Sequence, residues 1–313
     1  MMSPKTSLIR ADKITGKLIP NSERRAQARK RVTLNFLFDE FVSNKQEMKS
    51  IQCDISRYNN HVRGVLGKKD VKEIRPLDVY KLKKELSKKY KPQTVKHVLV
   101  LIRRIIYFGM SLHLSPRLDF TIEMPKFDNK KTEDMTDEQY KTFLMVLNEY
   151  EIHHPDPAKI MRLALFTGMR RSEIYGLQWL DVDFERGFIH IRDGKGVITE
   201  SIPINNLTRN VLKSVSRDRG SEYIFPNMTG GRLNRDSYYK HFKRIRELAG
   251  LPKDFRPMHG LRHTFASSLI SSGEVDLYTL QRLLTHKSPE MTQRYAHLRD
   301  KALKRASGIT VFL

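Results

Sequence analysis

Four short stretches in the C-terminal half of the sequence contain residues that could bind a phosphate or transfer a proton. In the first, FTGMRRSEI, Arg170 follows an apolar helix that ends at Gly168 and stands at the start of the next helix. A guanidinium group beside a helix start is a good phosphate ligand, because its N–H donors and the exposed backbone amides both favour an anion. An arginine that only caps a surface turn has the same pattern, so this stretch alone leaves both interpretations open.

The second stretch, RDGKGVI, places Lys195 between two glycines at the tip of a turn. An exposed lysine at such a tip could reach a bound substrate and donate a proton to a leaving oxygen. The stretch is not a phosphate-binding P-loop, because it lacks the G-x-x-x-x-G-K-[ST] spacing. A solvated lysine without a chemical role remains the alternative.

The third stretch, MHGLRHTFASSLI, places His259 and Arg262 on one face of a helix. His259 and His263 have the spacing of a zinc-binding pair. However, the first histidine is not followed by the glutamate of H-E-x-x-H, and no cysteine is available to complete a site. We therefore expect no metal here, and we interpret His263 as a core histidine.

The fourth stretch, LLTHKSPEMTQRYAHL, combines a histidine with a tyrosine. Ser288 and Pro289 predict the start of a helix, with His286 just ahead of it and Tyr295 about two turns along. A tyrosine becomes a nucleophile where a base or a cationic site favours its phenolate. The alternative is that Met291 and Tyr295 belong to a buried apolar stripe.

The charge of the whole chain indicates a polyanionic partner. It has 58 Lys and Arg against 35 Asp and Glu, a formal net charge of +23, which makes double-stranded DNA the first candidate. Residues 1–131 carry 30 of the basic and 13 of the acidic residues, so the electrostatic attraction is concentrated there. No stretch approaches the roughly 18 apolar residues of a membrane span, and the N-terminus lacks the apolar core of a signal peptide. We expect a cytoplasmic protein that has no membrane partner.

The elements that must position these residues fall into two domains, as the length of 313 residues also suggests. The predicted divisions are a basic arm (1–30), a helical DNA-binding domain (31–115), a polar linker (116–135), a catalytic domain (136–300) and a tail (301–313). Helical apolar spacing predicts four helices in the first domain. The second domain has two clear strands, GFIHIR and VITESIPI, and reads as helix after Arg235. The fold class is therefore mainly α with a small β-sheet.

Read together, the four stretches resemble the tyrosine recombinase family, which includes phage integrases and Xer-type resolvases. The resemblance runs from about residue 33 to residue 297 and is most specific in TGMRRSEI, GKG, HGLRHTFAS and LLTHKSPEMTQRYAHL. It implies a helical SAM-like core-binding domain followed by a recombinase catalytic domain. One departure is Thr285, where the family commonly has glycine.

The resemblance also implies a role for each residue in cutting and rejoining DNA through a covalent 3′-phosphotyrosine, with no metal, cofactor or ATP. Arg170 and Arg262 would hold the non-bridging oxygens of the scissile phosphate, and Lys195 would protonate the leaving 5′ oxygen. Tyr295 would be the nucleophile. The remaining roles are proton transfer at the tyrosine by His259, a hydrogen bond to the phosphate from His286, and support of the first arginine by Glu173.

Several alternatives stay open at this stage. The basic arm favours an integrase of a phage or mobile element over an Xer-type resolvase, which tends to begin at the core-binding domain. A type IB topoisomerase would share the nucleophile and the phosphate ligands, and a non-catalytic DNA-binding regulator is the candidate from another class. For a recombinase, the resemblance implies a homotetramer on two DNA sites, near the nucleoid, with DNA-bending accessory proteins as further partners. We expect residues 308–313 to pack on a neighbouring protomer; packing on their own domain is the alternative.

Overall fold

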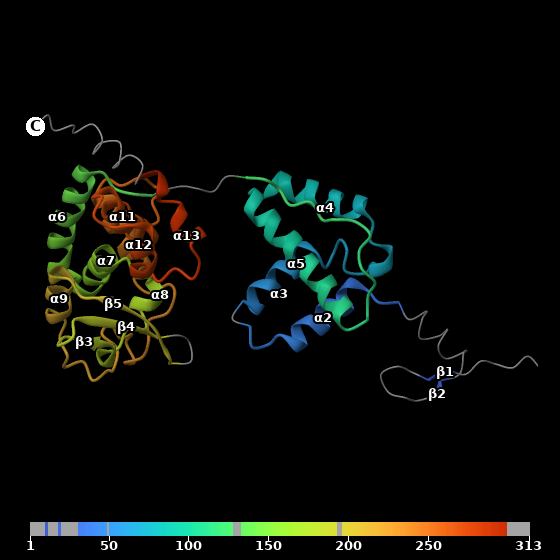
Figure 1. Cartoon of the computed structure of the whole chain (residues 1–313), viewed down its shortest axis with the longest axis horizontal. Helices are drawn as coiled ribbons and strands as arrows, with labels where there is room; N and C mark the ends of the chain where they lie inside the picture. Colours follow the sequence, from blue (N-terminus) through green and yellow to red (C-terminus); the bar gives the residue numbers. More distant parts are fainter. Residues whose placement is uncertain are drawn as a thin grey trace, which may run out of the picture. The chain divides into compact units, whose positions relative to one another are not determined.

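The computed structural model describes residues 10–11, 18–19, 31–48, 50–127, 133–192 and 196–298 (Figure 1). By its internal contacts the chain divides into two compact units, residues 1–129 and 130–313. Lys195, the tail 301–313 and most of the arm lie outside the described residues. In the arm, β1 (Arg10–Ala11) and β2 (Leu18–Ile19) form an antiparallel pair.

The described part of the first unit contains the four α-helices that the sequence predicts. They are α2 (Leu34–Asn44), α3 (Ile51–His61), α4 (Pro76–Lys89) and α5 (Pro92–Ser111), with a 3-10 turn, η1 (Val71–Glu73), between α3 and α4. Local sequence sets the helix starts: the side chain of Thr33 accepts a hydrogen bond from the backbone of Phe36, and α4 and α5 each begin with proline. Helix α5 packs against α2, α3 and α4 and supplies much of the core.

The segment expected as a linker differs from the prediction in its first half. Leu118, Phe120, Ile122 and Met124 pack against the core of the first unit. Their spacing of two residues is that of an extended chain with one apolar side, a signal that a search for helical periodicity does not register. Met135, near the other end of the segment, packs against the core of the second unit.

The second unit is a helical assembly with one small sheet. Its described α-helices are α6 (Asp137–His153), α7 (Pro155–Thr167), α8 (Arg171–Ile174), α9 (Asn206–Lys213), α10 (Tyr239–Leu248), α11 (Pro257–Ser271), α12 (Leu277–Leu283) and α13 (Glu290–Gln293). Helix α7 packs against α6, α9 and α11, and most of its side chains are buried. Thr136 and Gln139 form a capping box at the start of α6, a pairing that their spacing of three residues favours.

The sheet has three antiparallel strands in the order β3 (Val182–Asp183), β4 (Phe188–Arg192) and β5 (Ile198–Pro203), with a 3-10 turn, η2 (Trp179–Asp181), before it. Strands β4 and β5 confirm the two predicted from sequence. Strand β3 is not predicted, because a pair of residues is too short to show alternation. Figure 1 shows the strands together at one end of the unit, with α11 and α12 above them.

These elements confirm the expected fold class, mainly helical with a small sheet. Within the described ranges, no helix combines the length and the apolar character needed to cross a bilayer.

Candidate active site

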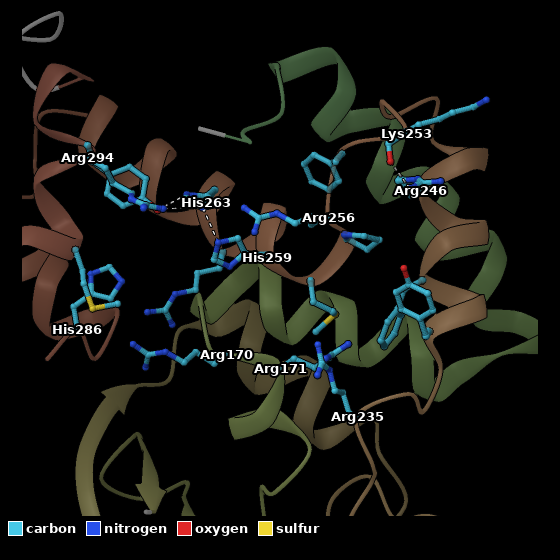
Figure 2. Close-up of a pocket in the computed structure, with 18 residues that line it drawn as sticks. Arg170, Arg171, Arg235, Arg246, Lys253, Arg256, His259, His263, His286 and Arg294 are labelled. Atoms are coloured by element: carbon cyan, nitrogen blue, oxygen red, sulfur yellow. Dashed lines mark hydrogen bonds between the residues drawn. The ribbon is translucent and has the colours of Figure 1, made fainter. Parts of the chain in front are cut away.

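A cavity of about 700 Å³ in the second unit is lined by residues from α8, α10, α11 and α13 and from the loops beside them (Figure 2). Among the described residues that line it, none is aspartate or glutamate. Its cationic side chains are Arg170, Arg171, Arg235, Arg246, Lys253, Arg256, Arg262 and Arg294. A cavity with this lining attracts anions, because the positive potentials of the side chains add where water is partly excluded.

Arg170 is held at the cavity by contacts from two directions. Its Nη1 donates to Oε1 of Glu173 at 2.8 Å, and its backbone N–H donates to Oε2 of the same carboxylate at 2.7 Å, which closes the N-terminus of α8. From the other side, Thr285 accepts two hydrogen bonds from the guanidinium, through Oγ1 at 2.6 Å and through its carbonyl oxygen at 3.1 Å. Glu173 thus supports this arginine, as the resemblance implies. The threonine contact could not be found from sequence, because 115 residues separate the partners.

Arg262, on α11, is 5% exposed and is tied to the backbone. Its guanidinium donates to the carbonyl oxygens of Gly168 and Leu284. Burial and the nearby charge of Arg170 lower the pKa of Arg262 to about 10, which leaves the group charged at neutral pH. The segment after α12 therefore accepts hydrogen bonds from both arginines, and the end of α7 also accepts one from Arg262.

Thr285 has a backbone φ of +50°, in the left-handed region that glycine favours. The conformation agrees with the glycine that the family commonly has here, so the threonine accepts backbone strain at this bend. In exchange, its hydroxyl binds Arg170, which a glycine could not do.

Two of the expected histidines line the cavity together with a third. His259 and His263 lie on α11, and His286 follows α12 with Nδ1 2.7 Å from Oγ1 of Thr292. Burial lowers the pKa values of all three, with further lowering from the surrounding cations: to about 4 for His259 and about 3 for His263 and His286. At neutral pH these imidazoles are uncharged, so each can accept a proton or a hydrogen bond.

Tyr295 is 2% exposed and packs in the apolar cluster of α11 and α12. The expected position two turns along a helix is wrong: α13 covers only Glu290–Gln293 and Tyr295 follows it. The backbone N–H of Tyr295 donates to the carbonyl of Thr292, and this tighter i to i+3 bond turns the chain toward α11. Both interpretations of the tyrosine contain part of the answer, since the ring is packed in the core while the hydroxyl is bound to a polar group.

That polar group is His263, whose Nδ1 lies 2.5 Å from the hydroxyl oxygen of Tyr295. The interpretation of His263 as only a core histidine misses this contact, although its burial is confirmed. The sequence held one signal, the spacing of His259 and His263, but spacing along one helix does not reveal a partner from another element. Burial raises the pKa of Tyr295 to about 12, against the opposing effect of Arg294 and Arg262, so the phenol keeps its proton in the free chain.

The structure thus brings Arg170, His259, Arg262, His286 and Tyr295 to one cavity, with Glu173 behind the first arginine. Lys195 lies outside the described residues, between β4 and Gly196. The other cations of the lining were not predicted from the sequence: Arg171, Arg235, Arg246, Lys253, Arg256 and Arg294. Within the described ranges there is no group of three or more His, Cys, Asp or Glu residues placed to hold a metal ion.

The family model described as "Phage integrase family" matches residues 133–302, more than half of the chain and the whole of the cavity. The chain belongs to the phage integrase family. This integrase-family chain is 33% identical over 135 residues to the tyrosine recombinase XerC of Xanthomonas axonopodis, covering 42% of this chain and 43% of that protein. It is 30% identical over 192 residues to XerD of Oceanobacillus iheyensis, covering 58% of this chain and 63% of the relative. The chain thus matches less than two thirds of the length of either recombinase.

Solved structures show the same fold. The integrase of the transposon Tn1549, in complex with transposon right-end DNA, matches the integrase-family chain with a TM-score of 0.72 and 19% identity, over 89% of this chain and 99% of that one. A lambda integrase dimer bound to a COC′ core site matches with a TM-score of 0.68 and 19% identity, over 88% and 81% of the two chains. At these identities the likeness establishes the fold.

Proposed function

We propose that this protein is a site-specific DNA recombinase of the integrase type, which cleaves and rejoins double-stranded DNA through a covalent 3′-phosphotyrosine at Tyr295. The observation that carries the proposal is the meeting of two arginines, three histidines and a buried tyrosine at one cavity, whose described lining residues include no Asp or Glu. Such a set suits a phosphodiester and a nucleophile held beside it. The family membership supports the same conclusion.

The phosphate would be held by Arg170 and Arg262. Transfer of the phosphoryl group builds charge on its non-bridging oxygens, and donors that are already in place stabilise that charge without reorganisation. Each guanidinium donates to a backbone carbonyl oxygen, and Arg170 also donates to Glu173. Both groups are therefore fixed before DNA binds. His286 would add a hydrogen bond to the phosphate, and His259 would assist proton transfer.

The attack would join the phenol oxygen of Tyr295 to the phosphorus and break the bond from phosphorus to the 5′ oxygen. Lys195 would protonate that leaving oxygen, which gives a 5′ hydroxyl. The phosphotyrosine conserves the energy of the broken bond, so a 5′ hydroxyl from another strand can reverse the reaction without a nucleotide cofactor. Phosphate contacts from the basic first unit would supply much of the affinity and make it steeply dependent on salt. Recombination would take place in the cytoplasm, at the nucleoid. The active assembly would be a homotetramer on two DNA sites, in which residues 308–313 of each chain dock on a neighbouring protomer. DNA-bending accessory proteins would take part where the sites require them.

The test is capture of the covalent intermediate. Cells that hold the host DNA and the mobile element express wild-type chain, Tyr295→Phe or Tyr239→Phe; the last removes the hydroxyl of another tyrosine in the cavity lining. Protein purified under denaturing conditions is then analysed for attached DNA, and the 3′ ends are sequenced. We expect adducts with wild type and Tyr239→Phe and none with Tyr295→Phe, which still binds DNA. Adduct that persists undiminished in Tyr295→Phe, or is absent from wild type, would overturn the proposal.

A second candidate, resolution by an Xer-type enzyme, is favoured by the names of the curated relatives. The same sequencing separates the two functions. Adducts at one site on the element and one site on the host DNA indicate integration, and adducts at copies of one host site indicate resolution. Adduct at no fixed sequence, with relaxation of any plasmid, would indicate a topoisomerase instead.

A further inference from the structure

We propose that His263 is the group that takes the phenol proton from Tyr295, and that His259 receives the resulting charge. This inference rests on the proposed function and assigns to its nucleophile a base that is not among the residues given a role by the family resemblance. It begins from one contact, the 2.5 Å separation of the tyrosine oxygen and Nδ1 of His263, both in side chains that are 2% exposed.

The direction of that hydrogen bond follows from what else is near it. Of the described residues, His263 is the hydrogen-bond partner of the Tyr295 hydroxyl. A phenol that keeps its proton needs an acceptor when it is buried, and Nδ1 of a neutral imidazole is one. If Nδ1 carried a proton instead, the phenol hydrogen would be buried without a partner. We therefore assign the free electron pair of His263 to Nδ1 and its hydrogen to Nε2.

The second ring nitrogen of His263 extends the series of hydrogen bonds from Tyr295 to His259. Its Nε2 lies 3.1 Å from Nε2 of His259, and the two rings meet edge to face. With hydrogen on Nε2 of His263, the nitrogen of His259 is the acceptor. Nη1 of Arg294 also lies 3.4 Å from Nε2 of His263, near the limit for such a bond, and it competes for the opposite assignment. Figure 2 shows His263 between Arg294 and His259, with the contacts drawn as dashed lines.

In the proposed step each proton moves from a named donor to a named acceptor. As the oxygen of Tyr295 bonds to phosphorus, its O–H bond breaks and the proton moves to Nδ1 of His263. The hydrogen on Nε2 of His263 moves to Nε2 of His259, which becomes an imidazolium. The bond from phosphorus to the 5′ oxygen breaks, and the leaving oxygen takes a proton from a separate donor, for which we proposed Lys195. Rejoining runs the same steps backwards and returns the phenol proton to Tyr295.

Transfer of a proton to His259 leaves His263 without a positive charge. Burial, the neighbouring His259 and the cations Arg294, Arg256 and Arg262 lower the pKa of His263 to about 3, so it does not keep a positive charge at neutral pH. His259 lies on the exposed side of α11, where water solvates a positive charge. A bound phosphodiester adds a negative charge beside these groups and raises the basicity of both imidazoles. Two acidic residues lie nearby: the charge of Asp134 acts on Tyr295, and Glu133 accepts hydrogen bonds from Arg256.

The first test uses the full chain without DNA. Nitrogen-15 labelling of histidine, with signals assigned through His259→Asn and His263→Asn, reports which ring nitrogen carries hydrogen at pH 7. We expect hydrogen on Nε2 of His263 and on Nδ1 of His259. Hydrogen on Nδ1 of His263 would overturn the inference, because that nitrogen would then donate to the tyrosine. The tautomers are read in the wild-type chain, and the substitutions serve only to assign its signals.

The second test measures single-turnover cleavage on a duplex that carries the cleavage position mapped from wild-type adducts. Asparagine at position 263 can accept the phenol hydrogen bond through Oδ1 but cannot take the proton. We expect His263→Asn to bind the duplex with unchanged affinity and to cleave on the order of 100-fold more slowly, the smaller end of the range for general-base catalysis. Fluorotyrosine at position 295, whose phenol is more acidic, restores part of the rate.

Sulfur in place of the bridging 5′ oxygen makes the leaving group independent of a proton donor. It should rescue Lys195→Ala and leave the defect of His263→Asn in place. Cleavage by His263→Asn at the wild-type rate or faster, as expected if the histidine only holds the tyrosine back, would overturn the inference and leave the proposed function standing. Rescue of His263→Asn by the sulfur duplex would do the same. Failure of the wild type itself to form adduct would overturn the proposed function and this inference with it.

Discussion

Replacement of Gly168 by alanine is expected to destabilise the second unit through two separable causes. Gly168 ends α7 with a φ of +65°, and its carbonyl oxygen accepts a hydrogen bond from Arg262. A β-carbon at this position would lie 2.5 Å from Cδ1 of Phe265 and 2.9 Å from Cδ2 of Leu284. Both atoms belong to side chains packed between α11 and α12, so relief of the overlap moves the elements that hold the arginine.

The magnitude follows from these two causes. A left-handed conformation destabilises a non-glycine residue in the folded state by about 1–2 kcal/mol. Alanine also lowers the conformational entropy of the unfolded chain, which stabilises the folded state by about 0.4–1 kcal/mol. Overpacking of a filled core adds about 1–3 kcal/mol. We therefore expect Gly168→Ala to lower the free energy of unfolding by about 2–4 kcal/mol.

Gly250 provides the matched control, because it has the same φ of +65° and a β-carbon there meets nothing within 4 Å. Gly250→Ala should cost about 1 kcal/mol, from the backbone alone. Urea unfolding followed by the fluorescence of Trp179 measures both variants, since this is the single tryptophan of the chain and packs against the core of the second unit. Equal losses in the two variants would refute the steric part of the reasoning.

Two further predictions use the same fluorescence. Thr285→Val keeps the strained backbone but loses the hydroxyl bound to Arg170, so it should lower the free energy of unfolding by about 1 kcal/mol after allowance for partial exposure. Thr285→Ser keeps the hydroxyl and should be nearly neutral. Equal stability of the two variants would contradict the assigned hydrogen bond. For His263, the pKa is lowered to about 3 in the folded chain and is about 6.5 when unfolded, so the unfolded state binds more protons between these values and stability falls as pH falls. From pH 7 to pH 5 wild type should lose up to about 2 kcal/mol more than His263→Asn, and parallel pH profiles would show that this histidine is not the cause.

Patterns confined to one segment predicted the structure well. The helix starts at Thr136 and at the prolines, and the strands before residue 193 and after residue 196, follow from local spacing and capping. The residues around Arg170 and Arg262 were also recognisable, because their motifs are short and continuous. What sequence could not supply were pairings across the fold, such as Thr285 with Arg170 or Tyr295 with His263.

The error at Tyr295 has a similar origin. A serine followed by proline predicts where a helix begins, but its length depends on contacts made later in folding. Thr292 uses its hydroxyl to bind His286, and the chain tightens after it, so the tyrosine turns into the cluster of α11 and α12. Burial of the tyrosine was considered as an alternative to a chemical role, yet in the structure the same burial brings the hydroxyl to a histidine.

The guanidinium of Arg262 is held by main-chain oxygens of residues 168 and 284, which every amino acid possesses. Exchange of the side chain at position 284 therefore leaves that grip intact, as long as the backbone keeps its course. Insertion or deletion of a single residue would not be tolerated in the same way, since it would shift the carbonyls out of reach. Relatives should accordingly differ in residue type at position 284 more readily than in the number of residues around it.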